Sequence, residues 1–166
     1  MERSLSSRLE AGGPYMGGVI QIQEYLRLRR GKRGVTMGKR ILVIDDEPDL
    51  TTLYETILVE NGFSVTCANS ANEGRQRLEE GRPDLILLDL VMPEKTGIRL
   101  FADLKKDERY KDIPIIVITG IKDVMGGDHK KFFEGLRTRV PAAYLEKPVD
   151  PQILVKTVRD VLQPGD

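Results

Sequence analysis

The chain has 166 residues, of which 31% are charged and 40% hydrophobic, and its formal net charge is zero. This composition is typical of a soluble globular protein, and the length favours one domain with a substantial core. No apolar stretch approaches the roughly 18 residues that span a membrane, and the N-terminus lacks the pattern of a secretory signal. The single cysteine, Cys67, cannot form an intrachain disulfide, which is typical of proteins in the reducing cytoplasm. We therefore expect a cytoplasmic protein, and the lack of a long apolar stretch predicts no membrane span.

The first part of the chain differs in charge from the rest. Residues 1–40 hold 9 Lys+Arg against 3 Asp+Glu, whereas residues 41–166 hold 17 against 23. Glycine-rich breakers interrupt residues 11–18, and a basic run follows at residues 27–33. We expect residues 1–37 to be an N-terminal extension, disordered or partly helical, and residues 38–166 to be the folded domain. An arm that binds nucleic acid or an anionic membrane is an alternative, but a basic run alone is weak evidence for it.

Beyond the extension, short apolar runs alternate with helical segments. The expected strands are residues 40–44, 64–68, 85–88, 113–119 and 142–147. The expected helices are residues 48–61, with Leu50, Leu53, Ile57 and Leu58 on one face, residues 71–80, a helix after the loop 92–97 that carries Leu100, Phe101 and Leu104, and residues 150–163, with Asp150 as the N-cap. Short β-branched runs between turns indicate buried parallel strands. The alternation therefore predicts an α/β architecture with helices on both faces of a parallel sheet.

Four of these apolar runs are followed by, or end in, a polar residue. Asp45 and Asp46 follow the first strand, Asp89 follows the third, Thr119 closes the fourth and Lys147 closes the fifth. In an open parallel sheet, the C-terminal strand ends line one crevice. Three carboxylates, a hydroxyl and an ammonium are therefore expected at a single edge.

These groups match the needs of phosphoryl chemistry. Clustered carboxylates repel one another unless a cation binds, and Mg²⁺ prefers such oxygen ligands together with a phosphate. Asp89 could then attack phosphorus as a nucleophile, while Lys147 supplies a second cation and Thr119 a hydrogen bond. Each residue alone has an ordinary structural explanation, such as a helix cap or a turn. Suitable residues at the ends of four of the five strands make coincidence a poor explanation.

Four segments together resemble the receiver domains of two-component response regulators. They are Ile44-Asp45-Asp46-Glu47-Pro48, the stretch from Leu87 to Gly97 (LLDLVMPEKTG), Ile118-Thr119-Gly120 and Tyr144-Leu145-Glu146-Lys147-Pro148, and the resemblance covers about residues 39–163. It implies a doubly wound, five-stranded parallel sheet of the (βα)5 flavodoxin-like type, with strand order 2-1-3-4-5.

The resemblance also implies a role for each acidic residue of the site. Asp89 corresponds to the phosphoacceptor, which takes a phosphoryl group from a histidine kinase or a phosphotransfer protein. Asp46 and Asp89 correspond to the Mg²⁺ carboxylates, the backbone carbonyl of Val91 to a third protein ligand, and Asp45 to the neighbouring acid. Mg²⁺ is the implied cofactor.

Three further residues receive roles from the same resemblance. Thr119 and Tyr144 correspond to the switch pair that responds to the new phosphate. Lys147 corresponds to the lysine that contacts the phosphoryl group, and the family usually has a cis proline after it, here Pro148.

We expect a bacterial, cytoplasmic phosphoprotein that catalyses only its own phosphorylation and dephosphorylation. No DNA-binding domain follows the last helix, so a downstream protein is the expected target. One alternative is an aspartate-nucleophile phosphatase, but such enzymes usually carry a second Asp two residues after the nucleophile, where this chain has Val91. A second alternative is a scaffold that works without phosphorylation.

One stretch departs from the family pattern. Thr119 and Lys147 lie 28 positions apart, and the surplus falls within residues 121–141. This segment belongs to the usual partner-binding face, so partner geometry and dimerisation through that face do not follow from the resemblance. The only histidine, His129, lies here, and we expect it to face solvent.

The extension generates the first testable prediction. Its breakers and its charge of +4 over residues 1–36 (7 Lys+Arg against 3 Asp+Glu) leave it too little apolar surface to offset the entropy of ordering. A chain that starts at Met37 should therefore melt within about 1–2 °C of the full chain in a thermal unfolding experiment. It should also be phosphorylated at the same rate. A large fall in melting temperature would instead reveal a docked helix.

Overall fold

The computed structural model describes residues 38–93, 96–120, 133–135 and 140–163 of the chain. The expected extension over residues 1–37, and His129, lie outside these residues, and of the segment 121–141 only residues 133–135 and 140–141 lie within them. Within the described part of the chain, no helix combines the length and apolar character that crossing a membrane requires.

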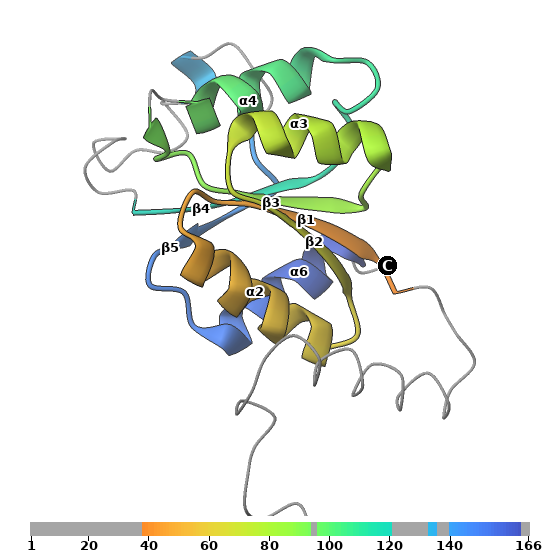
Figure 1. Ribbon diagram of the computed structural model, residues 1–166, viewed down its shortest axis with the longest axis vertical. Coiled ribbons are helices and arrows are strands. Elements are labelled where there is room, and N and C mark those ends of the chain that lie inside the picture. The colour runs from red at the N-terminus through yellow and green to blue at the C-terminus, as the bar shows by residue number, and fades with distance from the viewer. Residues whose placement is uncertain (1–37, 94–95, 121–132, 136–139, 164–166) are drawn as a thin grey trace, which may run out of the picture. The chain divides into compact units, whose positions relative to one another are not determined.

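A five-stranded parallel sheet forms the centre of the fold (Figure 1). Its elements in chain order are β1 (Arg40–Ile44), α2 (Pro48–Glu60), β2 (Ser64–Ala68), α3 (Ala71–Glu80), β3 (Leu85–Leu88), α4 (Thr96–Lys106), β4 (Ile115–Thr119), β5 (Ala143–Glu146) and α6 (Pro151–Leu162). The strands lie in the order β2-β1-β3-β4-β5, and each neighbouring pair is parallel. The fold class and strand order expected from the sequence are confirmed.

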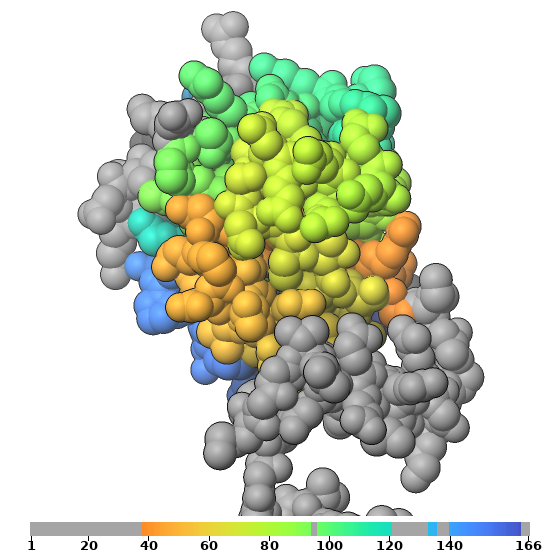
Figure 2. Space-filling model, in the orientation of Figure 1, coloured from red at the N-terminus to blue at the C-terminus, as the bar shows by residue number. Residues whose placement is uncertain are grey.

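Helices cover both faces of this sheet. In Figure 1, α3 and α4 lie on one side of the strands, and α2 and α6 lie on the other. In the orientation of Figure 2, the visible surface of the described residues is formed largely by α2 and α3. The two faces thus enclose two separate cores.

Strand β1 shows how one strand supplies both cores. Because successive side chains of a strand point to opposite faces, Ile41 and Val43 pack with the residues of α2 and α6, whereas Leu42 and Ile44 pack with those of α3 and α4. All four side chains are buried, as are all residues of β3 and β4. The near-continuous apolar runs of the sequence are therefore explained by burial on both faces.

The N-terminus of α6 shows the capping that the sequence predicts. The Asp150 side chain accepts hydrogen bonds from the backbone N–H groups of Gln152 and Ile153, which confirms it as the N-cap of α6.

Leu53 of α2 was expected on the apolar face but is 47% exposed. The buried face of α2 is centred on Tyr54 and Leu58. Leu53 precedes Tyr54 by one residue, which turns it about 100° around the helix axis from Tyr54.

A close backbone approach fixes the segment that follows β3. Gly97, in the first turn of α4, lies so near this loop that an added Cβ would fall 2.2 Å from the carbonyl oxygen of Asp89 and 2.7 Å from Cα of Leu90. Both are backbone atoms, which cannot rotate away as a flexible side chain can. The loop after Asp89 can therefore take its observed path only because residue 97 is a glycine and has no side chain.

Gly97→Ala should therefore destabilise the fold by about 1–3 kcal/mol, because the loop must move to admit the methyl group. Urea unfolding monitored by circular dichroism measures the effect. Gly120→Ala is the control, since a Cβ at Gly120 would meet no described atom within 4 Å. Equal stability of the two variants would contradict the packing argument.

Candidate functional site

Backbone hydrogen bonds bring the predicted site residues to one edge of the sheet. The Asp89 N–H donates to the carbonyl of Ile44 (2.9 Å), which extends the β1–β3 pairing by one residue. The Lys147 N–H donates to the carbonyl of Thr119 (3.2 Å) and does the same for β4 and β5. Asp45 directly follows β1. The parallel ladder itself thus places these residues side by side.

The Lys147 ammonium group lies at the centre of the site. Its Nζ is 2.8 Å from Asp45 Oδ2, 3.0 Å from Asp89 Oδ2 and 3.1 Å from Glu47 Oε1. The Asp45 and Asp89 side chains are only 2% and 3% exposed, whereas that of Glu47 is 60% exposed. The Asp45 contact is the shortest of the three. Two buried carboxylates and one exposed carboxylate therefore share a single cation.

Burial and charge act in opposite directions on this cluster. Burial lowers the pKa of Lys147, but the contacts with Asp45, Asp89 and Glu47 outweigh it and raise the pKa above the ordinary lysine value. Burial raises the pKa of Asp45, and its contacts with Lys147 and with the Glu47 N–H offset this only in part. Lys147 is therefore protonated at neutral pH, while ionised Asp45 is costly.

Loop N–H groups fix the other oxygen of each buried carboxylate. Asp89 Oδ1 accepts a hydrogen bond from the Val91 N–H (2.8 Å), and Asp45 Oδ1 accepts one from the Glu47 N–H (3.0 Å). Both residues thus present one oxygen to their own loop and the other to Lys147. The orientation of Asp89 is set by two partners, Val91 in the loop after β3 and Lys147 directly after β5.

Asp46, the second of the two acids that follow β1, has different surroundings from Asp45. Asp46 is half-buried and lines a neighbouring cavity of about 220 Å³, together with residues of the loops after β2 and β3. The acid that joins Asp45 and Asp89 around Lys147 is Glu47, which the sequence analysis named only as part of a motif. One signal in the sequence was available. Glu47 directly precedes Pro48 at the start of a helix, where Ser, Thr, Asp or Asn is the usual N-cap residue, so a Glu there was unusual.

The carboxylates of the site are suited to a hard divalent cation. One oxygen each of Asp45, Glu47 and Asp89 lies within 4.8 Å of the others. Carboxylate oxygens are the side-chain ligands that Mg²⁺ prefers, and among the described residues these three carboxylates share only one cation, Lys147. The donor set therefore fits the predicted Mg²⁺. The ligand roles of Asp46 and of the Val91 carbonyl remain predictions.

The two predicted switch residues lie on adjacent strands. Thr119 is fully buried, and its hydroxyl oxygen has no hydrogen-bond partner among the described residues. Tyr144 is half-buried, and its ring packs against Phe133 at a centroid distance of 5.6 Å. Phe133 in turn meets Phe101 of α4 at 4.9 Å. Phe133 was not identified from the sequence, because it lies in the stretch that departs from the family pattern.

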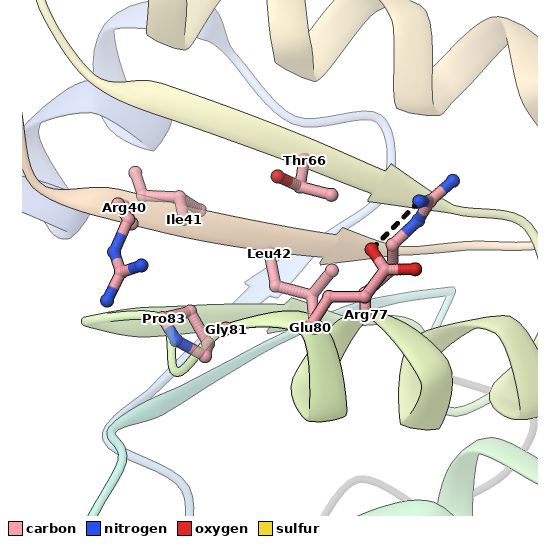
Figure 3. A pocket seen from close by; sticks show the side chains of 8 residues that line it. All are labelled: Arg40, Ile41, Leu42, Thr66, Arg77, Glu80, Gly81 and Pro83. Carbon is pink, nitrogen blue, oxygen red and sulfur yellow. Dashed lines mark hydrogen bonds and ion pairs between the residues drawn. The ribbon is translucent and has the colours of Figure 1, made fainter.

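A cis peptide bond follows Lys147 at this edge of the sheet, and a separate cavity lies at the other edge. The Lys147–Pro148 peptide bond is cis, as the resemblance implied. A cavity of about 170 Å³, drawn in Figure 3, lies at the opposite end of the strands, beside Arg40 at the start of β1. Its Arg77 is paired with Glu80, as the dashed line shows, and also with Glu73. That cavity is therefore separate from the carboxylate site.

Comparison with known sequences supports the same interpretation. A family model described as the response regulator receiver domain matches residues 41–159. The chain is 32% identical over 127 residues to the phosphate regulon transcriptional regulatory protein PhoB of Escherichia coli (strain K12), covering 76% of this chain and 53% of PhoB. It is 33% identical over 123 residues to protein PilH of Pseudomonas aeruginosa, covering 74% of this chain and 97% of PilH. The chain thus spans about half the length of PhoB and nearly all of PilH.

Solved structures show the same fold. A CheY-like response regulator receiver domain protein from Methanospirillum hungatei JF-1 superposes with a TM-score of 0.66 at 27% identity, covering 76% of this chain and 95% of that one. The chemotaxis protein CheY4 of Vibrio cholerae superposes with a TM-score of 0.65 at 26% identity, covering 75% and 98% respectively.

The raised pKa of Asp45 predicts how its replacement affects stability. A carboxyl group whose pKa is higher in the folded than in the unfolded state opposes folding once it is ionised in both states. Asp45→Asn removes this cost and keeps an oxygen for the Glu47 N–H. The variant should melt about 2–4 °C higher than the wild type at pH 7, and the difference should vanish below about pH 4, where Asp45 is neutral in both states.

Thermal unfolding at several pH values between 3.5 and 8 measures this difference. A lower melting temperature of Asp45→Asn at pH 7 would mean that the Lys147 contact outweighs the cost of burying Asp45.

Proposed function

The chain belongs to the response regulator receiver family, and on this basis we propose that Asp89 accepts a phosphoryl group from a phosphohistidine. The donor is a sensor histidine kinase or a phosphotransfer protein, and a downstream protein reads the result. The observation that carries the proposal is the buried Asp89 carboxylate at the end of the central strand, 3.0 Å from the Lys147 ammonium. A nucleophile with a fixed orientation and a cation beside it is what phosphoryl transfer requires.

The transfer is a displacement at phosphorus. A carboxylate oxygen of Asp89 forms the new P–O bond while the P–N bond of the phosphohistidine breaks, and the electron pair of that bond stays on the imidazole. Asp46 and Asp89, with the Val91 carbonyl and with Asp45 nearby, would hold Mg²⁺, which would supply positive charge to offset the charge on the transferring group. The protein contributes chiefly position and charge, as in other phosphoryl transfers.

The remaining residues receive roles that their surroundings support. Lys147 exchanges one carboxylate contact for a phosphoryl oxygen, so its charge remains compensated. The buried Thr119 hydroxyl, which has no hydrogen-bond partner within the described residues, donates to the phosphoryl oxygen. As Thr119 moves, Tyr144 takes up a new position against Phe133, and the local change alters a protein-binding face.

Turnover of external phosphoesters is the alternative that the site favours least. An aspartate-nucleophile phosphatase usually carries a second acid two residues after its nucleophile. That position holds Val91, an apolar side chain that is 47% exposed. We therefore propose a phosphoacceptor that acts on its own aspartate and not a hydrolase.

The proposal predicts that Asp89 is the only acceptor. Incubation with Mg²⁺ and acetyl phosphate, followed by intact-mass measurement, should show one phosphoryl group on the wild type and none on Asp89→Asn. The phosphate should be stable in acid and labile in base, as expected for an acyl phosphate. Asp160→Asn, an exposed position on α6, is the matched control and should be labelled like the wild type. Undiminished labelling of Asp89→Asn, with its fold verified by thermal melting, would exclude the assignment.

The proposal also predicts a strict requirement for the metal. Mg²⁺ should bind weakly without phosphate, because carboxylates alone supply few of its ligands. Asp46→Ala should lose Mg²⁺ binding in a calorimetric titration and should lose phosphorylation in parallel. Efficient labelling of the wild type in excess chelator would contradict the role of the metal.

A further inference from the structure

Glu47 is the exposed partner of Lys147. Its Oε1 lies 3.1 Å from Lys147 Nζ, at nearly the same distance as the two buried carboxylates of Asp45 and Asp89. Its side chain is 60% exposed, against 16% for Lys147. Glu47 therefore contacts the ammonium from the solvent side of the site, whereas Asp45 and Asp89 contact it from the interior.

The backbone of Glu47 is fixed in a way that directs the side chain there. Glu47 is the N-cap of α2, its N–H donates to Asp45 Oδ1 (3.0 Å), and its carbonyl accepts from the N–H groups of Leu50 and Thr51 (3.1 Å each). An N-cap side chain usually accepts a hydrogen bond from the first turn of its helix. The Glu47 side chain makes no such bond and reaches Lys147 instead.

We propose that Glu47 is a positioning residue that holds the Lys147 ammonium in the unphosphorylated site and thereby restrains phosphoryl transfer. This inference rests on the proposed function. In the resting site, Lys147 is shared among three carboxylates, and an arriving phosphoryl group must displace one of them. Asp89 is the nucleophile and Asp45 is buried, so the contact with Glu47 is the one that an incoming donor can replace at the surface.

The contact and the mere charge of Glu47 can be separated by three substitutions. Glu47→Gln keeps the shape and removes the charge. Glu47→Asp keeps the charge, but its carboxylate is shorter by one carbon–carbon bond, about 1.5 Å, and Asp is favoured as a helix N-cap, so it should leave Lys147. Asp49→Asn removes a charge from the exposed first turn of the same helix and leaves the three described ion pairs of Lys147 intact, so it serves as the control.

The first measurement is the second-order rate constant for phosphorylation by acetyl phosphate at fixed Mg²⁺, with Mg²⁺ affinity measured in parallel by calorimetry. An exposed ion pair has a modest strength, so Glu47→Gln and Glu47→Asp should each react about two- to fivefold faster than the wild type. The increase should shrink at high ionic strength, because salt screens an exposed pair. Mg²⁺ affinity should be unchanged in both variants, and Asp49→Asn should behave like the wild type.

The second measurement needs no phosphate. The hydrogen-exchange rate of the Lys147 ammonium protons, followed by ¹⁵N NMR, should rise in both Glu47 variants and not in Asp49→Asn. Unchanged exchange would overturn the proposed hold on Lys147, whereas a wild type that takes up no phosphate would overturn the proposed function alone.

Two kinetic outcomes would also overturn the inference. If Glu47→Asp reacts like the wild type while Glu47→Gln is faster, only the charge matters and the contact has no role. If Glu47→Gln is slower and binds Mg²⁺ more weakly, Glu47 is a metal ligand. The second outcome has a structural basis, because the Glu47 carboxylate lies within 4.8 Å of those of Asp45 and Asp89.

Discussion

Lys147 brings one positive charge into a largely buried cluster of carboxylates, and the geometry of the site depends on that contact. It joins the end of β5 to the acids that follow β1 and β3, which are 102 and 58 residues away in the chain. Two buried carboxylates so close together would repel each other strongly without a cation. A buried ion pair contributes little net stability, but removal of one partner leaves an uncompensated charge. The cluster is therefore better understood as a means of fixing the Asp89 carboxylate in one orientation than as a source of stability.

The order of the sheet makes this contact possible with few dedicated interactions. Each site residue lies at or just after the end of a strand, and the parallel ladder aligns those ends through contacts such as the Asp89 N–H with Ile44 and the Lys147 N–H with Thr119. Gly97 then lets α4 approach the loop after Asp89 without a clash. Fold and site are thus linked through the backbone, and the side chains add charge to positions that the sheet already defines.

Much of this arrangement could be predicted from the sequence, and the failures have physical causes. Strand periodicity and the polar residues at the strand ends were sufficient to place Asp45, Asp89, Thr119 and Lys147 at one edge. The same pattern gave no reason to place Glu47 beside Lys147, because the direction of its side chain depends on the cap of α2. The exposure of Leu53 was missed because several helical faces share the same apolar spacing. These errors concern side-chain direction, which depends on tertiary contacts that a single sequence does not contain.

The central claim is that the Asp89 carboxylate is the group that becomes phosphorylated. The most direct test is to phosphorylate the wild type with Mg²⁺ and acetyl phosphate, reduce the product with borohydride, and map the resulting peptides by mass spectrometry. Borohydride converts an aspartyl phosphate to homoserine, so the modification reports the acceptor residue itself. The account predicts homoserine at position 89 and at no other acidic position. Homoserine at Asp45 or Asp46, the 5-hydroxynorvaline that a reduced glutamyl phosphate would give at Glu47, or no reduced residue in a protein that has gained phosphate, would contradict the account.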